Sequence, residues 1–231
     1  VNTAPSVSLE NTVTQIDENT DTSSAIKVAD IVITDDGTGT NVLSLSGADA
    51  SAFEIVGTEL FLVTGTDLDF ESKEGFDVTV NVDDASVGST PDDSASLHLA
   101  VNDINESPSL IALDNTLVDE NAAGAIIGAL IVSDVDAGDS HTFSVDDARF
   151  EVIGGELKLV DGDSLNFELE PSVALTVTAT DQGGLSTSET FTIFVNDINE
   201  APTDIYLGSN TVDENVDGAV IGVLSTVDED T

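Results

Sequence analysis

The sequence has no cysteine, no tryptophan and no methionine, and only four of its 231 residues are lysine or arginine. Without cysteine, disulfide bonds are excluded as a stabilising device. The 46 acidic residues give a formal net charge of −42 at pH 7. A charge of this sign excludes nucleic-acid binding through phosphate contacts and attraction to an anionic lipid surface. A compact state with this charge would repel itself, and bound cations are the simplest remedy.

Long hydrophobic runs are also missing. No apolar run approaches the ~18 residues that a transmembrane helix needs, so we expect no direct membrane insertion. No signal peptide is recognisable, although a sequence that starts within a repeated motif would not show one. Hydrophobic residues make up 40% of the chain and aromatic residues only 4%, a composition that favours β-structure with cores of Val, Ile and Leu.

One stretch of eight residues organises the chain. Residues 101–108 (VNDINESP) return as residues 195–202 (VNDINEAP), and a truncated copy (VNTAP) opens the sequence. Each full copy follows an alternating apolar segment and ends in proline, which predicts a strand that runs into a stiff junction. The interval between copies has the size of a domain. We therefore predict repeat 1 at residues 1–104, repeat 2 at 105–198 and the truncated start of repeat 3 at 199–231.

Each full repeat consists of short alternating segments separated by turn residues. Matching segments of the two repeats include 25–35 with 125–134, and 76–83 with 174–181. About seven short strands per repeat at this spacing are typical of a Greek-key β-sandwich, and no segment has a sustained period of 3.6 residues. The predicted fold class is all-β, with tandem immunoglobulin-like sandwiches in an extended array. Residues 84–91, an insertion in repeat 1, are expected on a loop.

Acidic and amide side chains gather where the predicted strands end. Repeat 2 has Glu120 after its first strand, Asp134 and Asp136 after a later one, and Asp197 in the junction. Two carboxylates ~4 Å apart repel by about 4 kcal/mol at an effective dielectric constant near 20. Carboxylate and amide oxygens are the ligands that Ca²⁺ prefers. The pattern therefore predicts calcium at the junctions.

These motifs resemble those of the cadherin repeat. The resemblance rests on the glutamate after the first strand, the Asp134-Val135-Asp136 turn, the Leu165-Asn166-Phe167-Glu168 box, the Ala179–Gly183 turn and the 195–200 linker. All five occur in order in repeat 2, and three recur in repeat 1. In particular, the chain is similar to the repeats of large bacterial secreted or surface adhesins. The resemblance implies cadherin-like sandwiches, an extracellular or cell-surface location, and calcium ions held between consecutive repeats.

The resemblance also implies a set of calcium ligands. At the first junction these are Glu18, Asp69, Glu71, Asp103, Asn105, Glu106, Asp134, Asp136 and Asp181. At the second junction they are Glu120, Asn166, Glu168, Asp197, Asn199, Glu200, Asp228 and Asp230. A backbone carbonyl near Asp139 or Ser140 is also implied. Repeat 1 departs from the pattern, because its adjacent Asp35 and Asp36 lack the Asp-x-Asp spacing.

The sequence also bears on three other functions: an EF-hand, an enzyme and a carbohydrate-binding module. An EF-hand that starts at Asp134 is excluded, because its twelfth position would be Val145 where that loop needs glutamate. No nucleophile–histidine pairing or phosphate-binding loop is visible, so we expect no enzyme. The alternative is a carbohydrate-binding module, yet Phe53, Phe70 and Phe150 are interpreted as core residues rather than sugar platforms. Besides calcium, the expected partners are further repeats of the same chain, surface glycans or a homophilic partner.

Overall fold

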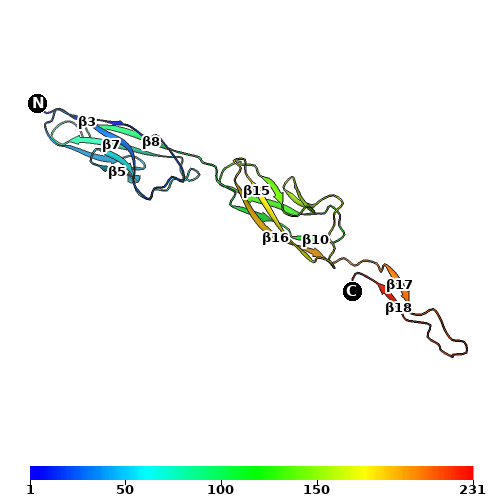
Figure 1. Cartoon of the computed structure of the whole chain (residues 1–231). Helices are drawn as coiled ribbons and strands as arrows, with labels where there is room; N and C mark the ends of the chain where they lie inside the picture. Colours follow the sequence, from blue (N-terminus) through cyan, green and yellow to red (C-terminus); the bar gives the residue numbers. More distant parts are fainter. Residues whose placement is uncertain (231) are drawn as a thin grey trace. The chain divides into compact units, whose positions relative to one another are not determined.

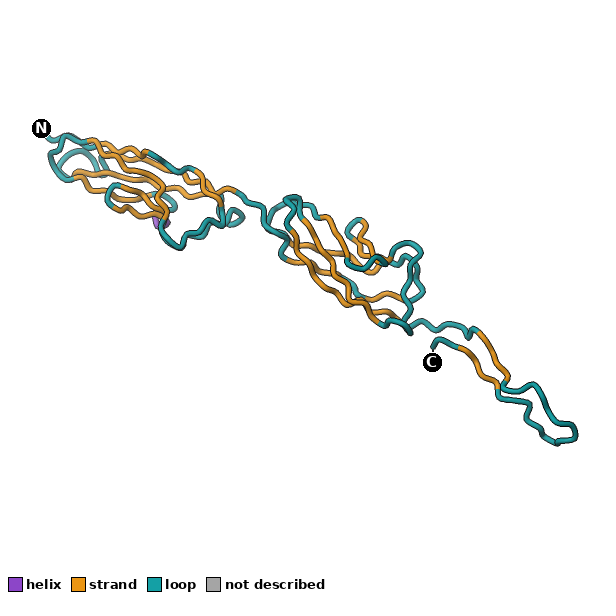
Figure 2. The backbone as a smooth tube through the Cα atoms, in the orientation of Figure 1, coloured by secondary structure: helices purple, strands orange, loops and turns teal. Residues whose placement is uncertain are grey.

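A computed structural model describes residues 1–230, so the last residue of the predicted third segment, Thr231, lies outside the described part. The chain forms two compact units with a boundary between Asn105 and Glu106. Strands dominate both units, and the helical residues of the described part are a single 3₁₀ turn, Ala50–Ala52 (Figure 2). No helix in residues 1–230 is long and apolar enough to cross a membrane.

Unit 1 is a sandwich of two four-stranded sheets (Figure 1). One sheet has the order β1-β3-β6-β5 and the other β2-β8-β7-β4. The strands are β1 (Ser6–Glu10), β2 (Gln15–Asp17), β3 (Ile26–Thr34), β4 (Asn41–Ser46), β5 (Phe53–Val56), β6 (Glu59–Leu62), β7 (Gly75–Asp84) and β8 (Asp93–Asn102). Residues 85–92 connect β7 to β8, so the predicted insertion lies on a loop except for Asp84, which ends β7.

The second unit repeats this arrangement with the sheet orders β13-β14-β11-β9 and β10-β16-β15-β12. Its sandwich strands are β9 (Leu110–Leu113), β10 (Leu117–Asp119), β11 (Ile126–Ser133), β12 (Thr142–Val145), β13 (Phe150–Ile153), β14 (Glu156–Leu159), β15 (Ser172–Thr180) and β16 (Ser186–Asn196). A hairpin of β17 (Asp204–Leu207) and β18 (Leu224–Val227) follows. The predicted all-β fold of tandem sandwiches is confirmed.

The first strand of each sandwich is divided between the two sheets. In unit 1, β1 pairs antiparallel with β3, whereas β2 pairs parallel with β8 in the opposite sheet. Asn11 lies between them with φ +48°, a left-handed conformation that asparagine tolerates, and its side chain donates to Asp30. Each sandwich therefore has eight strands rather than the seven predicted.

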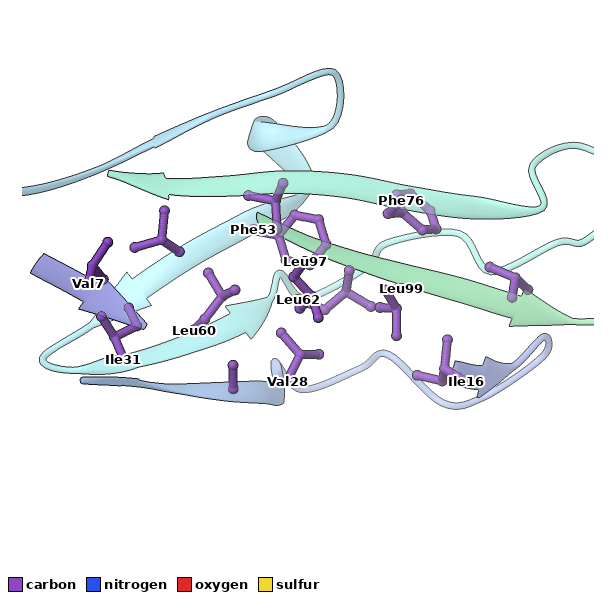
Figure 3. Packing of buried hydrophobic residues seen from close by; sticks show 14 of the residues in the cluster. Val7, Ile16, Val28, Ile31, Phe53, Leu60, Leu62, Phe76, Leu97 and Leu99 are labelled. Atoms are coloured by element: carbon purple, nitrogen blue, oxygen red, sulfur yellow. The ribbon is translucent and has the colours of Figure 1, made fainter. Parts of the chain in front are cut away.

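Alternation along the strands builds the core. In β7, Phe76, Val78, Val80 and Val82 are all buried, because every second side chain points between the sheets. Figure 3 shows side chains of both sheets meeting in this layer of unit 1. A matching core forms in unit 2.

The phenylalanines belong to these cores. Phe53 and Phe150 are buried, and Phe70 packs against the core of unit 1. Their interpretation as core residues is therefore confirmed. The β17–β18 hairpin has no such core, since all eight of its strand residues are exposed.

Candidate metal centres

Glu18 anchors the first acidic group, at the end of β2. Glu18 is only 4% exposed. Oε2 accepts a hydrogen bond from the backbone N–H of Phe70 (2.8 Å), and Oε1 accepts one from that of Ile104 (2.7 Å). Asn19 follows with φ +57° and turns the chain away from the strand. One buried carboxylate therefore ties β2 to the loop before β7 and to the segment after β8.

Two further carboxylates converge on Glu18. One oxygen each of Glu18, Glu71 and Asp103 lie within 4.8 Å of one another. The backbone N–H of Glu71 lowers the pKa of its own carboxyl, but desolvation and the carboxylates of Glu18, Asp103 and Asp69 together raise that pKa above its usual value. A shift in this direction is the expected result of like charges held together without a cation.

Unit 2 repeats this construction at Glu120, which is 3% exposed. Its oxygens accept hydrogen bonds from the backbone N–H groups of Phe167 and Ile198, both at 2.8 Å. The bonds from Ile198 and Phe167 lower the pKa of Glu120. Glu120, Glu168 and Asp197 each place an oxygen within 4.8 Å of the other two. The same device thus occurs once in each sandwich.

A third group occupies the turn after β11. Oxygens of Asp134, Asp136 and Asp139 lie within 4.8 Å of one another. His141 Nε2 lies 2.8 Å from Asp134 Oδ2, and both side chains are largely buried. The backbone N–H of Glu106 donates to Asp136 Oδ2 (2.9 Å). The turn is therefore tied to the start of unit 2.

The corresponding turn at the C-terminal end of unit 2 forms a fourth group. Glu168, Glu200 and Asp230 place oxygens within 4.8 Å of one another. The backbone N–H of Glu200 donates to Asp230 Oδ2 (2.7 Å), and that of Asp230 reaches Asp228 Oδ1 (3.3 Å). Desolvation, followed by the charges of Glu120 and Asp230, raises the pKa of Glu200 to about 7. Ionising this carboxyl is therefore costly in these surroundings.

Several predicted ligands lie outside these groups of converging carboxylates. Asp69 accepts hydrogen bonds from the amide and hydroxyl of Ser72, and the hydroxyl and amide of Ser72 lower the pKa of Asp69. Asn166 accepts from the amide of Leu169, and the side chain of Asn199 donates to the carbonyl of Glu200. These residues, with Asn105 and Asp181, remain predicted ligands.

The structure corrects the register of the two repeats near Asp181. The sequence matched Asp181 with Asp83, but the counterpart is Asp84. Asp84 and Asp181 are both buried. Asp84 accepts a hydrogen bond from the backbone N–H of Ser86 (3.0 Å), and Asp181 accepts the equivalent bond from that of Leu185 (2.8 Å). The predicted match of 76–83 with 174–181 is one residue out of register along the whole strand, because the buried positions pair Phe76 with Val173 rather than with Ala174.

Two side chains at the Asp134 turn make contacts that the sequence did not predict. A backbone carbonyl near Asp139 or Ser140 was expected, and the carboxylate of Asp139 also joins the group. His141 lies just before β12 and contacts Asp134, a contact that no sequence pattern predicts. An acidic residue five positions after Asp134 was visible, yet only the turn's conformation shows that the two side chains converge.

The chemistry of the groups fits a hard cation. All their ligand atoms are oxygens, and Asp139 Oδ2 and Glu200 Oε2 are buried without a hydrogen-bond partner. Lys27, Lys73, Arg149 and Lys158 form their ion pairs with other acids. Within residues 1–230, these groups therefore have no lysine or arginine ion pair to neutralise them, and Ca²⁺ suits such oxygen sets.

Substitutions at Glu120 should separate its two roles, as a hydrogen-bond acceptor and as a negative charge among converging carboxylates. We expect Glu120→Ala to expose the amides of Phe167 and Ile198 to faster hydrogen exchange, because it removes two charge-assisted hydrogen bonds of about 1.5–3 kcal/mol each. Glu120→Gln keeps one acceptor oxygen and should protect one of the two amides. Both variants also remove one negative charge from the Glu120–Glu168–Asp197 group. Amide exchange by NMR measures the first effect, and unchanged exchange in Glu120→Ala would contradict this role.

No family model matches the chain. Human protocadherin gamma-B7 is 27% identical over 183 residues, which cover 73% of this chain and 19% of the relative. The Fat-like cadherin-related tumor suppressor homolog of Drosophila melanogaster is 27% identical over 169 residues, covering 68% and 4%. The chain thus spans less than a fifth of these curated relatives, which are cadherins rather than enzymes.

Solved structures agree on the fold. Extracellular cadherin domains 1–5 of protocadherin gamma B2 superpose with a TM-score of 0.72 at 20% identity, covering 99% of this chain and 46% of that one. Mouse cadherin-23 domains EC22–24 give a TM-score of 0.70 at 18% identity, covering 98% and 78%. The fold of this chain is therefore that of tandem extracellular cadherin domains.

Proposed function

We propose that this chain is a calcium-stiffened spacer of a cell-surface or secreted adhesion protein. The observation that carries the proposal is the pair of matched groups, Glu18 with Glu71 and Asp103, and Glu120 with Glu168 and Asp197. Each lies where a sandwich runs into the next linker. Carboxylates that converge without a basic partner are costly unless a cation joins them.

Calcium would be held by the converging acids, supported by the other predicted ligands. Its binding would neutralise like charges and restrict the linkers around 103–106 and 197–200, so that successive repeats would stop swivelling. Extracellular modules typically bind calcium with dissociation constants of about 10⁻⁴–10⁻³ M, and millimolar calcium would fill them. The proposed role of this segment is mechanical, with repeats 1 and 2 as spacer units and residues 199–231 as the start of a third.

The adhesion context is the broader part of the proposal. It is supported by the cadherin-like fold and by the matched relatives, one of which is a protocadherin gamma-B7 fragment described as a cis-dimer. A homophilic partner or further repeats are the partners that this fold favours. The named relatives are animal proteins, so the proposed bacterial adhesin context rests on the sequence pattern alone.

Small-angle X-ray scattering of the whole chain tests the proposal. We expect the maximum dimension and the flexibility of the scattering particle to change when millimolar calcium is replaced by excess chelator, with stiffer linkers in calcium. The double variant Asp134→Asn/Asp136→Asn should remain flexible at the first linker even in calcium. Asp163→Asn, which removes an exposed acid of repeat 2, is the matched control and should behave as wild type. Coincident profiles with and without calcium would refute the spacer role.

A further inference from the structure

One sheet of unit 2, of the order β13-β14-β11-β9, has an apolar outer face. Strands β9 and β11 of this sheet contain no charged residue, although the chain has a net charge of −42. Single exposed apolar side chains are ordinary, whereas neighbouring ones on one face mark an interaction surface. Four large side chains that are more than half exposed form this apolar face, together with two smaller ones: Leu110, Ile126, Ile131 and Ile153, with Ala112 and Ala129.

Strand pairing shows that these side chains are neighbours. Ile131 of β11 lies directly opposite Ala112 of β9. Glu156 of β14 pairs with Ala129 on one side and with Ile153 on the other. Directly opposed residues, and residues two apart in a strand, project from the same face of a sheet. The apolar face therefore extends from β9 across β11 to β13, with Glu156 between Ala129 and Ile153.

The equivalent face of unit 1 is polar at most of these positions. The strand pairs and the bulge in β3 and β11 fix the correspondence between the units. Across this face of unit 1, Lys27 forms ion pairs with Asp30 and Glu59. Because both units form the same sandwich, the fold does not require apolar residues here. The positions of Ser6, Ser8, Lys27 and Asp30 are occupied in unit 2 by Leu110, Ala112, Ile126 and Ala129; in the opposite direction, Lys158 stands where unit 1 has Phe61.

We propose that the apolar face of unit 2 binds the same face of a second copy of this chain. A two-fold dimer joins identical patches, and an apolar patch is complementary to itself. Two chains that each carry a charge of −42 can approach only where few acids lie, and the apolar face meets this condition. Glu156 and Lys158 alternate on β14. A two-fold axis that crosses β14 between them would set the acid of one copy beside the base of the other.

The size of the face indicates a weak dimer. Its strands of four, eight, four and four residues cover a plane of roughly 300 Å², at ~3.3 Å per residue and ~4.8 Å between strands. Even with side-chain relief and flanking loops, two copies would bury less than the ~1,200 Å² in total at which standard stable interfaces begin. We therefore expect a dissociation constant above about 1 μM.

Sedimentation equilibrium of the full chain in millimolar calcium, at micromolar to millimolar protein concentrations, tests the dimer. We expect Ile153→Asp to weaken association on the order of tenfold, because it places a charge in an apolar contact. Val56→Asp is the matched control: Val56 occupies the position of Ile153 in unit 1 and is 55% exposed against 56%. This variant adds the same charge and should leave the dimer intact.

A second variant keeps the test independent of any folding defect in Ile153→Asp. Leu110→Ser/Ala129→Asp gives unit 2 the residues that the same sandwich carries in unit 1, and it should also weaken the dimer. Sodium chloride should strengthen association of the wild-type chain, since salt screens the repulsion between the copies and leaves an apolar contact in place. Weakening by salt would contradict an apolar interface.

The outcomes separate this dimer from the spacer role. The proposal deepens the adhesion context of the proposed function, on which it rests, but it uses no calcium site. A chain that stays monomeric at millimolar concentration, while its scattering still stiffens in calcium, refutes the dimer alone. A dimer whose linkers stay flexible in calcium refutes the spacer alone. Equal weakening by Val56→Asp, or a dimer that survives both Ile153→Asp and Leu110→Ser/Ala129→Asp, would overturn the assignment to the apolar face.

Discussion

Replacing calcium with excess chelator should lower the midpoint of thermal unfolding of the chain by more than ~10 °C. A site filled at about ten times its dissociation constant contributes roughly 1.4 kcal/mol, and a change of 1 kcal/mol shifts the midpoint of a domain of this size by about 4–8 °C. Unit 2 alone contains the groups around Glu120, Asp134 and Glu200. Loss of calcium also restores repulsion among their carboxylates. Differential scanning calorimetry measures the shift.

Ionic strength provides the control for this experiment. If the effect came only from screening of the −42 charge, sodium chloride at matched or higher ionic strength would restore the midpoint, because salt screens exposed charges. We expect sodium chloride to recover little of the loss and added calcium to recover all of it. An identical midpoint with and without chelator would contradict calcium binding by the acidic groups.

A matched pair of core substitutions should show whether the two units unfold independently. Leu60 and Leu157 occupy corresponding positions on β6 and β14, and both are 0% exposed. Replacing either with alanine should destabilise its own sandwich by about 2–5 kcal/mol, through lost burial and the cavity that remains. We expect Leu60→Ala to affect unit 1 and Leu157→Ala to affect unit 2. Urea unfolding followed by hydrogen exchange resolves the two transitions.

The control substitutions for this pair are at exposed positions of the same strand pairs. Val56→Ala on β5 and Ile153→Ala on β13 remove methyl groups from side chains that are more than half exposed, so they should change stability by only about 0.5 kcal/mol. Equal destabilisation of both units by Leu60→Ala would mean that the chain unfolds as one cooperative body. In that case the two-unit description would not extend to folding.

The sequence alone determined the fold class, the repeated architecture and two of the acidic groups. Strand alternation is local, so the burial of Val78, Val80 and Val82 follows from a period of two. The duplicated glutamates, Glu18 and Glu120, were identified because their whole neighbourhood recurs at a domain-sized interval. A repeated motif indicates equivalent positions in the two domains even when the contacts of those positions are not known.

Tertiary structure decided which acids converge. Asp69 was predicted as a ligand beside Glu71; its carboxylate accepts hydrogen bonds from Ser72 and lies outside the converging groups, so its ligand role stays a prediction. The carboxylate of Asp139 joins Asp134 and Asp136 through the conformation of a turn. Neighbouring side chains in a sequence can point apart, and distant ones can meet, because side-chain direction depends on backbone dihedrals.

The acids around Asp84, at the end of β7, also show that sequence neighbours alone do not reveal which side chains meet. The members of this group come from the first residues of the chain, the 35–41 loop, the end of β7 and the insertion. Pairing of β4 with β7 places Asn41 opposite Asp84. Because Gly39 has no side chain, the 35–41 loop can lie close to the carboxylate of Asp84. Composition indicated that cations are needed, whereas strand register and loop packing determined where unsatisfied oxygens are buried.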